Sequence, residues 1–349
     1  MKTKPLRAVI IGFGNVAQKL AAMLTEERGK YPGLMDLDLE AVAVFTRGHG
    51  GLVDPKGIGL GKALKQFREN GAFPAAPISA LQALKTLDYD VLVELSTLDI
   101  ERRGEPAVAH VRAALERGLS AVTANKGPAA FAFRELRCLA REKGGRFLFE
   151  SAVMDGAPVF GLERALAGCR VSGLSGILNT TTNFVISRLE AGESMESAVR
   201  AAQRLGFAEA DPSLDLDGWD AAAKTAILAN FFLGADIDPL RVERQGIGGL
   251  APADAARAVK GGMRLKLVCR AWMENGVARA TVRPEEVPAG QYLAAVSGKG
   301  AALRLETDMM APFWVVQENP GLADTAAGVL QDLLTVALKV PVEGGAASR

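Results

Sequence analysis

The chain has 349 residues, of which 49% are hydrophobic and 23% are charged, and its formal net charge is +1. This composition excludes an intrinsically disordered chain and gives no basic excess that would favour nucleic acid or another polyanion as a partner. The length allows two domains that each bury a core. No apolar run reaches the length of a membrane span.

The cysteines and histidines restrict the possible chemistry. Cys138, Cys169 and Cys269 are far apart and odd in number, which favours a reducing cytoplasm over a disulfide framework, so we expect them to lie in the core. Of only two histidines, His110 falls in a helical pattern that also carries Arg and Glu. We expect a solvent-exposed position for it, so acid/base chemistry must rest on Lys and Asp.

The chain begins with a predicted strand, a glycine turn and a helix. The short, β-branched run 7–12 ends at Gly12. Gly14 and a helical pattern that starts near Asn15 and Val16 follow it. Gly12 would permit the tight turn, Gly14 would let a pyrophosphate approach the backbone, and the phosphate would bind the free N–H groups that open the helix. A glycine turn alone is common, but its place at the first of several alternating strands and helices favours a dinucleotide-binding domain.

The second predicted strand, 39–45, ends at Thr46 and Arg47 rather than at an acidic residue. An Asp or Glu there would bind the adenosine ribose, whereas Arg47 can pair with a 2′-phosphate, so NADP is favoured over NAD. The alternative is an arginine in a mobile loop, since glycines are frequent from 48 to 61.

Two further strand ends carry polar residues. A predicted strand at 90–95 precedes Ser96 and Thr97, and after a helix at 104–118 the strand 119–123 leads into Asn125 and Lys126. The carboxyl ends of parallel strands form the ligand-binding edge of an open α/β sheet. We therefore expect these four residues to contact the cofactor, although Lys126 could instead only cap a helix.

After a helix at 130–143 and a strand at 146–149, the nucleotide-domain pattern stops. A strand at 174–178 is followed by a polar cluster, 179–183, before a helix at 184–189. The cluster offers hydroxyls and N–H groups to a carboxylate, although a plain helix cap needs only one of these residues. A helix at 197–205 follows.

An acidic stretch at 209–224 carries the strongest signal for a site. Its carboxylates meet no basic residue until Lys224, one helical turn beyond Asp220, in the otherwise apolar segment 221–233. The alternative is a surface pair that contributes a few tenths of a kcal/mol. A solvated helix face would carry more charges, so we expect Lys224 to face a closed site.

The remaining segments complete a mixed α/β pattern. Strands at 264–273 and 277–283 would form a hairpin across Asn275-Gly276. Strands at 301–306 and 313–317 and an amphipathic helix at 322–338 follow, and the tail from Glu343 has the composition of a disordered segment.

Taken together, these motifs resemble the homoserine dehydrogenase family in its short form without a C-terminal regulatory domain. The resemblance rests on Gly12-Phe-Gly14-Asn-Val, Val122-Thr-Ala-Asn125-Lys126, Phe149-Glu150, 176–183, and 208–224 with its acids and Lys224. It implies a Rossmann domain, 1–148 rejoined by the C-terminal helix 320–342, and a mixed α/β catalytic and dimerisation domain, 149–319. The implied reaction is the reversible NAD(P)-linked reduction of L-aspartate 4-semialdehyde to L-homoserine, in the pathway to threonine, methionine and isoleucine, by a cytoplasmic homodimer.

The resemblance also implies roles for single residues. Lys126 and Lys224 match the two lysines around the reacting oxygen, with Asp220 beside them; a partly desolvated lysine can have its pKa lowered toward neutrality for proton transfer. The implied substrate contacts are Glu209 and Asp215 for the ammonium and Thr180 and Thr181 near the carboxylate. The implied sodium ligands, largely through backbone oxygens, are Glu150, Val153, Asp155 and Ala157.

Several positions depart from the family pattern. Met154-Asp155-Gly156 replaces a more glycine-rich run, Thr180 stands where Gly is usual, Phe207 replaces a frequent Tyr, and the glycine-rich stretch near 318–322 is degraded. Two alternatives therefore stay open: a related NAD(P)-dependent oxidoreductase for another amino acid or semialdehyde, and a non-catalytic NADP-binding protein. Retention of both Asp220 and Lys224 favours chemistry.

Overall fold

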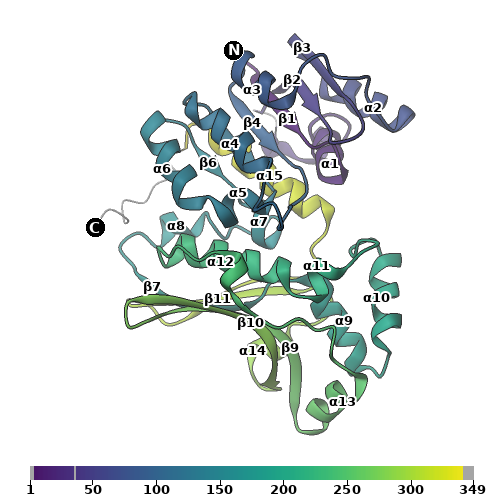
Figure 1. Cartoon of the computed structure of the whole chain (residues 1–349), viewed down its shortest axis with the longest axis vertical. Helices are drawn as coiled ribbons and strands as arrows, with labels where there is room; N and C mark the ends of the chain where they lie inside the picture. Colours follow the sequence, from purple (N-terminus) through teal and green to yellow (C-terminus); the bar gives the residue numbers. More distant parts are fainter. Residues whose placement is uncertain (1–3, 35–36, 341–349) are drawn as a thin grey trace. The chain divides into compact units, whose positions relative to one another are not determined.

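The computed structural model describes residues 4–34 and 37–340; the predicted disordered tail from Glu343 lies outside this range. The chain divides into two compact units, each described by itself below. The first comprises the chain through Arg164 together with the segment that begins at Gly321, and the second comprises Ala165–Pro320 (Figure 1).

The first unit is built on a six-stranded sheet in the order β3-β2-β1-β4-β5-β6. All neighbouring strands are parallel except β3, which is antiparallel to β2. The strands are β1 (Leu6–Ile11), β2 (Leu39–Phe45), β3 (Gly51–Ile58), β4 (Val91–Glu94), β5 (Ser120–Thr123) and β6 (Phe147–Leu148). The helices are α1 (Asn15–Leu24), η1 (Arg28–Lys30), η2 (Pro32–Leu34), α2 (Leu60–Asn70), α3 (Ala80–Thr86), α4 (Ala107–Glu116), α5 (Lys126–Phe131), α6 (Phe133–Lys143), α7 (Ser151–Met154) and α15 (Leu322–Ala337), with α8 (Leu162–Ala165) at the boundary of the two units in sequence.

This sheet is covered on both faces. Ala8 and Ile10 of β1 belong to one hydrophobic cluster, whereas Val9 and Ile11 belong to a second. Because alternate residues of a strand point to opposite faces, each face has its own apolar layer, as a continuous apolar strand sequence requires. The predicted Rossmann-type fold of the N-terminal part is confirmed.

Two local features of this unit differ from the sequence analysis. No strand was recognised between 48 and 61, but β3 pairs there with β2, with Leu52 opposite Val44; Gly50, at φ +72°, permits the turn that reverses the chain. The predicted helix 130–143 is two helices, α5 and α6, because Ala132 leaves the helical region at φ −135° and ψ 20°.

Helix α15 packs within the first unit. Its Ala326, Val329 and Leu333 are buried in the same cluster as Ile10. A Cβ at Gly328 would lie 2.4 Å from the hydroxyl of Ser151, so the absence of a side chain there allows α15 to approach α7 closely.

The second unit contains a six-stranded sheet in the order β12-β11-β7-β9-β10-β8. It is antiparallel except for β8 and β10, so the predicted mixed α/β architecture of this part is confirmed. The strands are β7 (Val171–Ile177), β8 (Glu243–Arg244), β9 (Met263–Glu274), β10 (Val277–Pro288), β11 (Ala301–Thr307) and β12 (Phe313–Gln317). The helices are α9 (Thr180–Glu190), α10 (Met195–Arg204), α11 (Ser213–Leu216), α12 (Trp219–Phe232), η3 (Pro239–Arg241), α13 (Pro252–Lys260) and α14 (Tyr292–Ala295).

The β9–β10 hairpin turns at the predicted dipeptide. Asn275 and Gly276 have φ values of +49° and +79°, as the Asn-Gly hairpin turn requires.

The prediction that all three cysteines lie in the core was wrong: Cys269 in β9 is buried, but Cys138 is exposed on α6. Leu136 and Ala140 supply the buried face of α6, and Cys138 lies between them in sequence on the opposite side. Within the residues that the structure describes, no helix combines the length and the hydrophobicity that crossing a membrane requires.

Candidate functional site

The glycine turn after β1 has the geometry of a phosphate-binding loop. Gly12 has φ +91°, and a Cβ there would lie 2.5 Å from the carbonyl carbon of Leu95. A Cβ at Gly14 would meet no atom within 4 Å, so the backbone there is open to close approach by a ligand. Helix α1 begins at Asn15, has no side-chain cap and has no acidic residue in its first turn. Its first N–H groups, at Asn15 and Val16, can therefore bind an anion.

Arg47 is exposed just after β2. The turn that carries it is tied by Thr46, whose hydroxyl donates to the carbonyl oxygen of Gly50 at 2.8 Å and accepts from the N–H of His49 at 2.8 Å. A guanidinium held at this strand end is available to a phosphate group.

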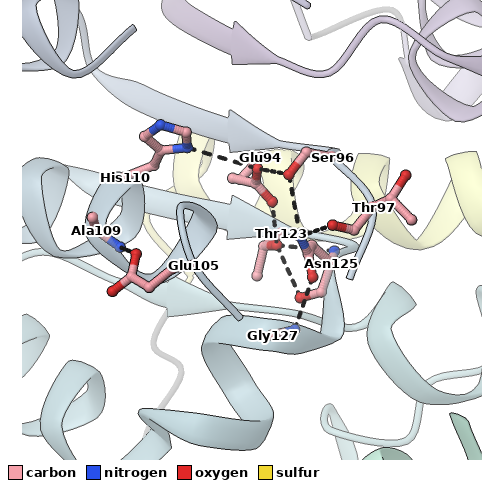
Figure 2. A network of polar contacts seen from close by, with 9 residues as sticks. All are labelled: Glu94, Ser96, Thr97, Glu105, Ala109, His110, Thr123, Asn125 and Gly127. Atoms are coloured by element: carbon pink, nitrogen blue, oxygen red, sulfur yellow. Dashed lines mark hydrogen bonds and ion pairs between the residues drawn. The ribbon is translucent and has the colours of Figure 1, made fainter. Parts of the chain in front are cut away.

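The ends of β4 and β5 are joined through Asn125 (Figure 2). The Asn125 Nδ2 group donates to Ser96 Oγ and to the carbonyl oxygen of Thr97, both at 3.2 Å. Its Oδ1 accepts from the N–H of Gly127 at 2.8 Å and so caps α5. The cap of α5 is thus Asn125, and Lys126 is the first helical residue, where a cation is disfavoured by the helix dipole. Capping therefore does not explain the lysine, which favours a ligand-binding role.

The segment predicted to bind sodium lies around α7. The carboxylate oxygens of Glu150 accept from the N–H groups of Phe160 at 2.8 Å and Gly161 at 3.0 Å. Asp155 Oδ1 accepts from the Thr325 hydroxyl at 2.8 Å, and the carbonyl oxygen of Ala157 accepts from the N–H of Val159 at 2.8 Å.

Val153 is buried in α7 itself. The Glu150 and Asp155 carboxylates already accept hydrogen bonds from protein donors, so these side chains do not form an open carboxylate site for sodium. Over residues 4–34 and 37–340, no group of three or more His, Cys, Asp or Glu side chains is close enough to hold a metal ion.

A second buried carboxylate lies beside Glu150. The Asp332 carboxylate of α15 accepts from the backbone N–H of Glu150 at 2.8 Å. Burial and the neighbouring Glu150 raise the pKa of Asp332 well above its ordinary value. Burial also raises the pKa of Glu150, which its backbone hydrogen bonds partly offset.

In the second unit, Lys224 lies at the centre of a compact polar cluster. Helix α12 is buried from Ala221 to Asn230 at every position except Lys224. Lys224 Nζ lies 3.1 Å from Asp220 Oδ2, and both side chains are 14% exposed. It also donates to the carbonyl oxygen of Leu178, just after β7, at 2.8 Å. Lys224 therefore lies in a largely enclosed, polar environment; that this environment is a site stays a prediction.

Asn179 joins the two acids of this cluster. Its Nδ2 group donates to Asp215 Oδ1 at 2.6 Å and to Asp220 Oδ2 at 2.8 Å. Its Oδ1 accepts from the N–H of Thr182 at 2.8 Å and so caps α9, which begins earlier than predicted. One amide thus holds two carboxylates near each other while Lys224 supplies a positive charge.

The charge state of Asp215 reflects this crowding. Burial, and then repulsion by Asp220, raise the pKa of Asp215, whereas hydrogen bonds from Asn179 and Thr181 and the charge of Lys224 lower it. A cationic group brought to this cluster would favour the ionised form of Asp215. The arrangement can therefore bind an ammonium group and exchange a proton through Lys224.

The other predicted substrate residues are less closely joined. Thr181 is buried, and its hydroxyl lies 3.2 Å from the carbonyl oxygen of Phe207. Thr180, the first residue of α9, is partly exposed. Glu209 is exposed, and its backbone carbonyl oxygen accepts from the side chain of Gln203 at 3.0 Å. The structure brings Asp215, Asp220 and Lys224 together but does not bring Glu209 into that cluster.

Sequence reasoning missed several residues of these sites. Asn179 was placed in the polar cluster 179–183 that could bind a carboxylate, but its contacts with Asp215 and Asp220 were not predicted. His110 was predicted to be solvent-exposed and is instead 8% exposed, because α4 packs against α3, α5, α6, β4 and β5. Its ring faces Glu94 at the end of β4, which was not predicted at all (Figure 2).

The chain matches two family models, one in each part of the sequence. Residues 12–150 match the family model described as "Homoserine dehydrogenase, NAD binding domain", and residues 158–334 match the model "Homoserine dehydrogenase". The chain is 33% identical over 337 residues to an "NAD(+)-dependent homoserine dehydrogenase" of Pseudomonas canavaninivorans. The aligned region covers 95% of this chain and 96% of that protein.

Solved structures agree as well. A homoserine dehydrogenase from Thiobacillus denitrificans superposes with a TM-score of 0.81 at 27% identity and covers 99% of this chain and 76% of its own. A hyperthermophilic archaeal homoserine dehydrogenase in complex with NADPH gives a TM-score of 0.80 at 26% identity and covers 97% of this chain and 99% of its own. The chain therefore belongs to the homoserine dehydrogenase family, which comprises NAD(P)-dependent oxidoreductases that act on a CH–OH group.

Proposed function

We propose that the protein catalyses the reversible reduction of L-aspartate 4-semialdehyde to L-homoserine, a step in the synthesis of threonine, methionine and isoleucine. The observation that carries the proposal is the Lys224–Asp220–Asn179–Asp215 cluster. A substrate with both an ammonium group and a carbonyl oxygen suits a cluster that combines two carboxylates with one lysine.

The nicotinamide of the cofactor supplies or accepts the hydride, and the protein handles the proton. In the direction of reduction, the carbonyl oxygen gains negative charge and needs a proton, which Lys224 donates while Asp220 orients its ammonium group. In the other direction, Lys224 accepts the hydroxyl proton. Lys126 is assigned to the same reacting oxygen from the family resemblance.

The substrate's ends have separate partners in this proposal. Asp215 and Glu209 bind the ammonium, and Thr180 and Thr181 lie near the carboxylate. Asp215 carries the stronger support because its carboxylate is already joined to Asp220 through Asn179.

A substrate panel with the purified protein tests the function. We expect NAD(P)H formation with L-homoserine and none with L-serine or L-threonine, measured by absorbance with both cofactors. A rate with another amino alcohol and none with homoserine would show that the protein is a related oxidoreductase with a different substrate. Measurable cofactor binding without turnover of any compound would favour the non-catalytic alternative.

The cofactor requires a second test, because the relatives differ: one is named NAD(+)-dependent and another was solved with NADPH. We propose NADP, with Arg47 at the 2′-phosphate and with Gly12, Gly14, Asn15, Val16, Ser96, Thr97 and Asn125 along the rest of the cofactor. Arg47→Ala should weaken NADP binding at least tenfold and leave NAD binding within about twofold, since only NADP carries the phosphate. Equal losses for both cofactors in a binding titration would exclude this role.

The remaining assignments complete the proposal. We propose a cytoplasmic homodimer, in which 149–319 forms the catalytic and dimerisation domain and 1–148 with 320–342 forms the cofactor domain. Trp272 of β9 stays partly exposed on its sheet and is a candidate for the dimer surface; light scattering on Trp272→Glu tests this.

The family resemblance also implies a sodium ion at Glu150, Val153, Asp155 and Ala157. Rates measured in equal concentrations of Na⁺ and K⁺ test it, and we expect no difference because the carboxylates there bind protein donors.

A further inference from the structure

A fully buried carboxylate lies under the predicted cofactor-binding edge of the first unit. Glu94, the last residue of β4, is 0% exposed. A buried carboxylate is costly unless hydrogen bonds or a positive charge compensate it. Glu94 has two hydroxyl donors and a neighbouring imidazole: the Ser96 hydroxyl donates to Oε1, the Thr123 hydroxyl donates to Oε2 at 3.5 Å, and His110 Nδ1 lies 3.9 Å from Oε1.

The contact with Glu94 fixes the direction of the hydrogen bonds above it. Ser96 donates its single hydroxyl proton to Glu94 Oε1. The Ser96 oxygen can then only accept from its other neighbour, Asn125 Nδ2, at 3.2 Å. This orients the Asn125 amide with its nitrogen toward Ser96 and its oxygen toward the N–H of Gly127. Figure 2 shows this chain of contacts running from β4 across to α5.

Thr123 adds a second link. Its hydroxyl oxygen accepts from the backbone N–H of Asn125 at 3.0 Å and lies 3.2 Å from the carbonyl oxygen of the same residue. Both strand ends are therefore tied to Asn125, the residue that caps the helix on which Lys126 stands. His110 makes no hydrogen bond through Nδ1 within the described residues, so the chain of hydrogen bonds runs through Ser96 and Thr123 alone.

We propose that Glu94 is a positioning residue for cofactor binding: its buried carboxylate sets the orientation of Ser96 and Asn125 and so holds the ends of β4 and β5 in the arrangement that binds the cofactor. The inference rests on the proposed cofactor contacts of Ser96, Thr97 and Asn125. In a parallel sheet of this order, the carboxyl ends of β4 and β5 lie on the half that binds one end of a dinucleotide.

Glu105, in the turn before α4, is a control carboxylate. Its carboxylate accepts from the N–H of Ala109 at 3.0 Å at the start of α4, and its side chain is 39% exposed. Figure 2 shows it near the same strands, with no contact drawn to Ser96 or Asn125. Glu105→Gln therefore removes a carboxylate nearby without touching the chain of contacts.

A double-mutant cycle on the full-length protein tests the proposal. Dissociation constants for NADP⁺ and NADPH are measured by calorimetric titration for wild type, Glu94→Gln, Ser96→Ala and the double variant. Each single variant should weaken binding about tenfold, which corresponds to about 1.4 kcal/mol. The double variant should be within about threefold of the weaker single variant, because Glu94→Gln weakens the acceptor and Ser96→Ala removes the donor of the same contact. Glu105→Gln should stay within twofold of wild type and combine with Ser96→Ala multiplicatively.

Losses that multiply in the Glu94–Ser96 cycle, or wild-type affinity of Glu94→Gln, would overturn the inference. Circular dichroism melting of each variant separates these effects from unfolding. If Glu94→Gln does not fold, Glu94→Asp replaces it in the cycle, because the shorter side chain keeps the carboxyl group and withdraws it from Ser96. If wild type binds neither nucleotide, or Ser96→Ala binds both normally, the proposed cofactor site itself fails; a loss at Ser96 with none at Glu94 refutes only the positioning role.

Discussion

Replacement of Lys224 by methionine separates catalysis from stability at the proposed active site. Lys224 and Asp220 are each 14% exposed and their charged atoms lie 3.1 Å apart. Removing one partner of a buried ion pair costs about 3–5 kcal/mol, and some solvent contact here favours the lower value of about 3 kcal/mol. For a unit of this size, that corresponds to a fall in Tm of roughly 6–12 °C. Loss of a proton-transfer group should lower kcat about 10²–10⁴-fold.

The double variant Asp220→Asn/Lys224→Met provides the control. A neutral amide at 220 removes the carboxylate that lost Lys224 as its partner and the repulsion between Asp220 and Asp215, and it can still accept from Asn179, so we expect it to recover at least half of the lost Tm while kcat stays low. Tm is measured by circular dichroism, and kcat by NADPH absorbance with aspartate 4-semialdehyde well below the Tm. A single variant with kcat within tenfold of wild type would remove Lys224 from the mechanism. A double variant no more stable than the single one would refute the ion-pair reasoning.

Two further predictions concern the space around two glycines and the pKa of Asp332. Gly12→Ala should lower the free energy of unfolding by about 1–3 kcal/mol, since its Cβ would meet the backbone of Leu95 at 2.5 Å. Gly14→Ala has open space around its Cβ, so it should keep the wild-type melting temperature and lose only cofactor affinity; similar melting of both variants would contradict this. The pKa of Asp332 is raised in the folded state by burial and by Glu150, so between its unfolded and folded pKa values the folded state keeps a proton that the unfolded chain releases. Wild type should therefore lose stability relative to Asp332→Asn as pH rises from 4 to 7 in urea unfolding, and parallel curves would exclude the effect.

The parts of the fold that sequence predicted are those specified by local chemistry. The β9–β10 turn needed only Asn275-Gly276, and the Gly12–Gly14 turn needed only its place between a strand and a helix. Lys224 was recognisable because a single charge in an apolar helix is unusual whatever surrounds it.

The parts that sequence did not predict depend on contacts distant along the chain. Asn179 reaches acids 36 and 41 residues away, which no local pattern around it contains. His110 has the sequence surroundings of an exposed helix face, yet α3 and α6 also cover its helix. Strand β3 forms only because β2 offers an edge to pair with, which outweighs the glycines and the proline of its own sequence.

Helix α15 belongs to the core of the first unit but is translated after the whole second unit. The sheet β1–β6 is translated first, but Ala326, Val329 and Leu333, which bury one of its faces, follow only after the whole of Ala165–Pro320. Until then, the apolar surface around Ile10 and Leu20 has no cover from α15. The second unit is therefore fully synthesised before α15, so it can complete its own core earlier than the first unit. A nascent chain arrested before Gly321 should bind chaperones through that uncovered face.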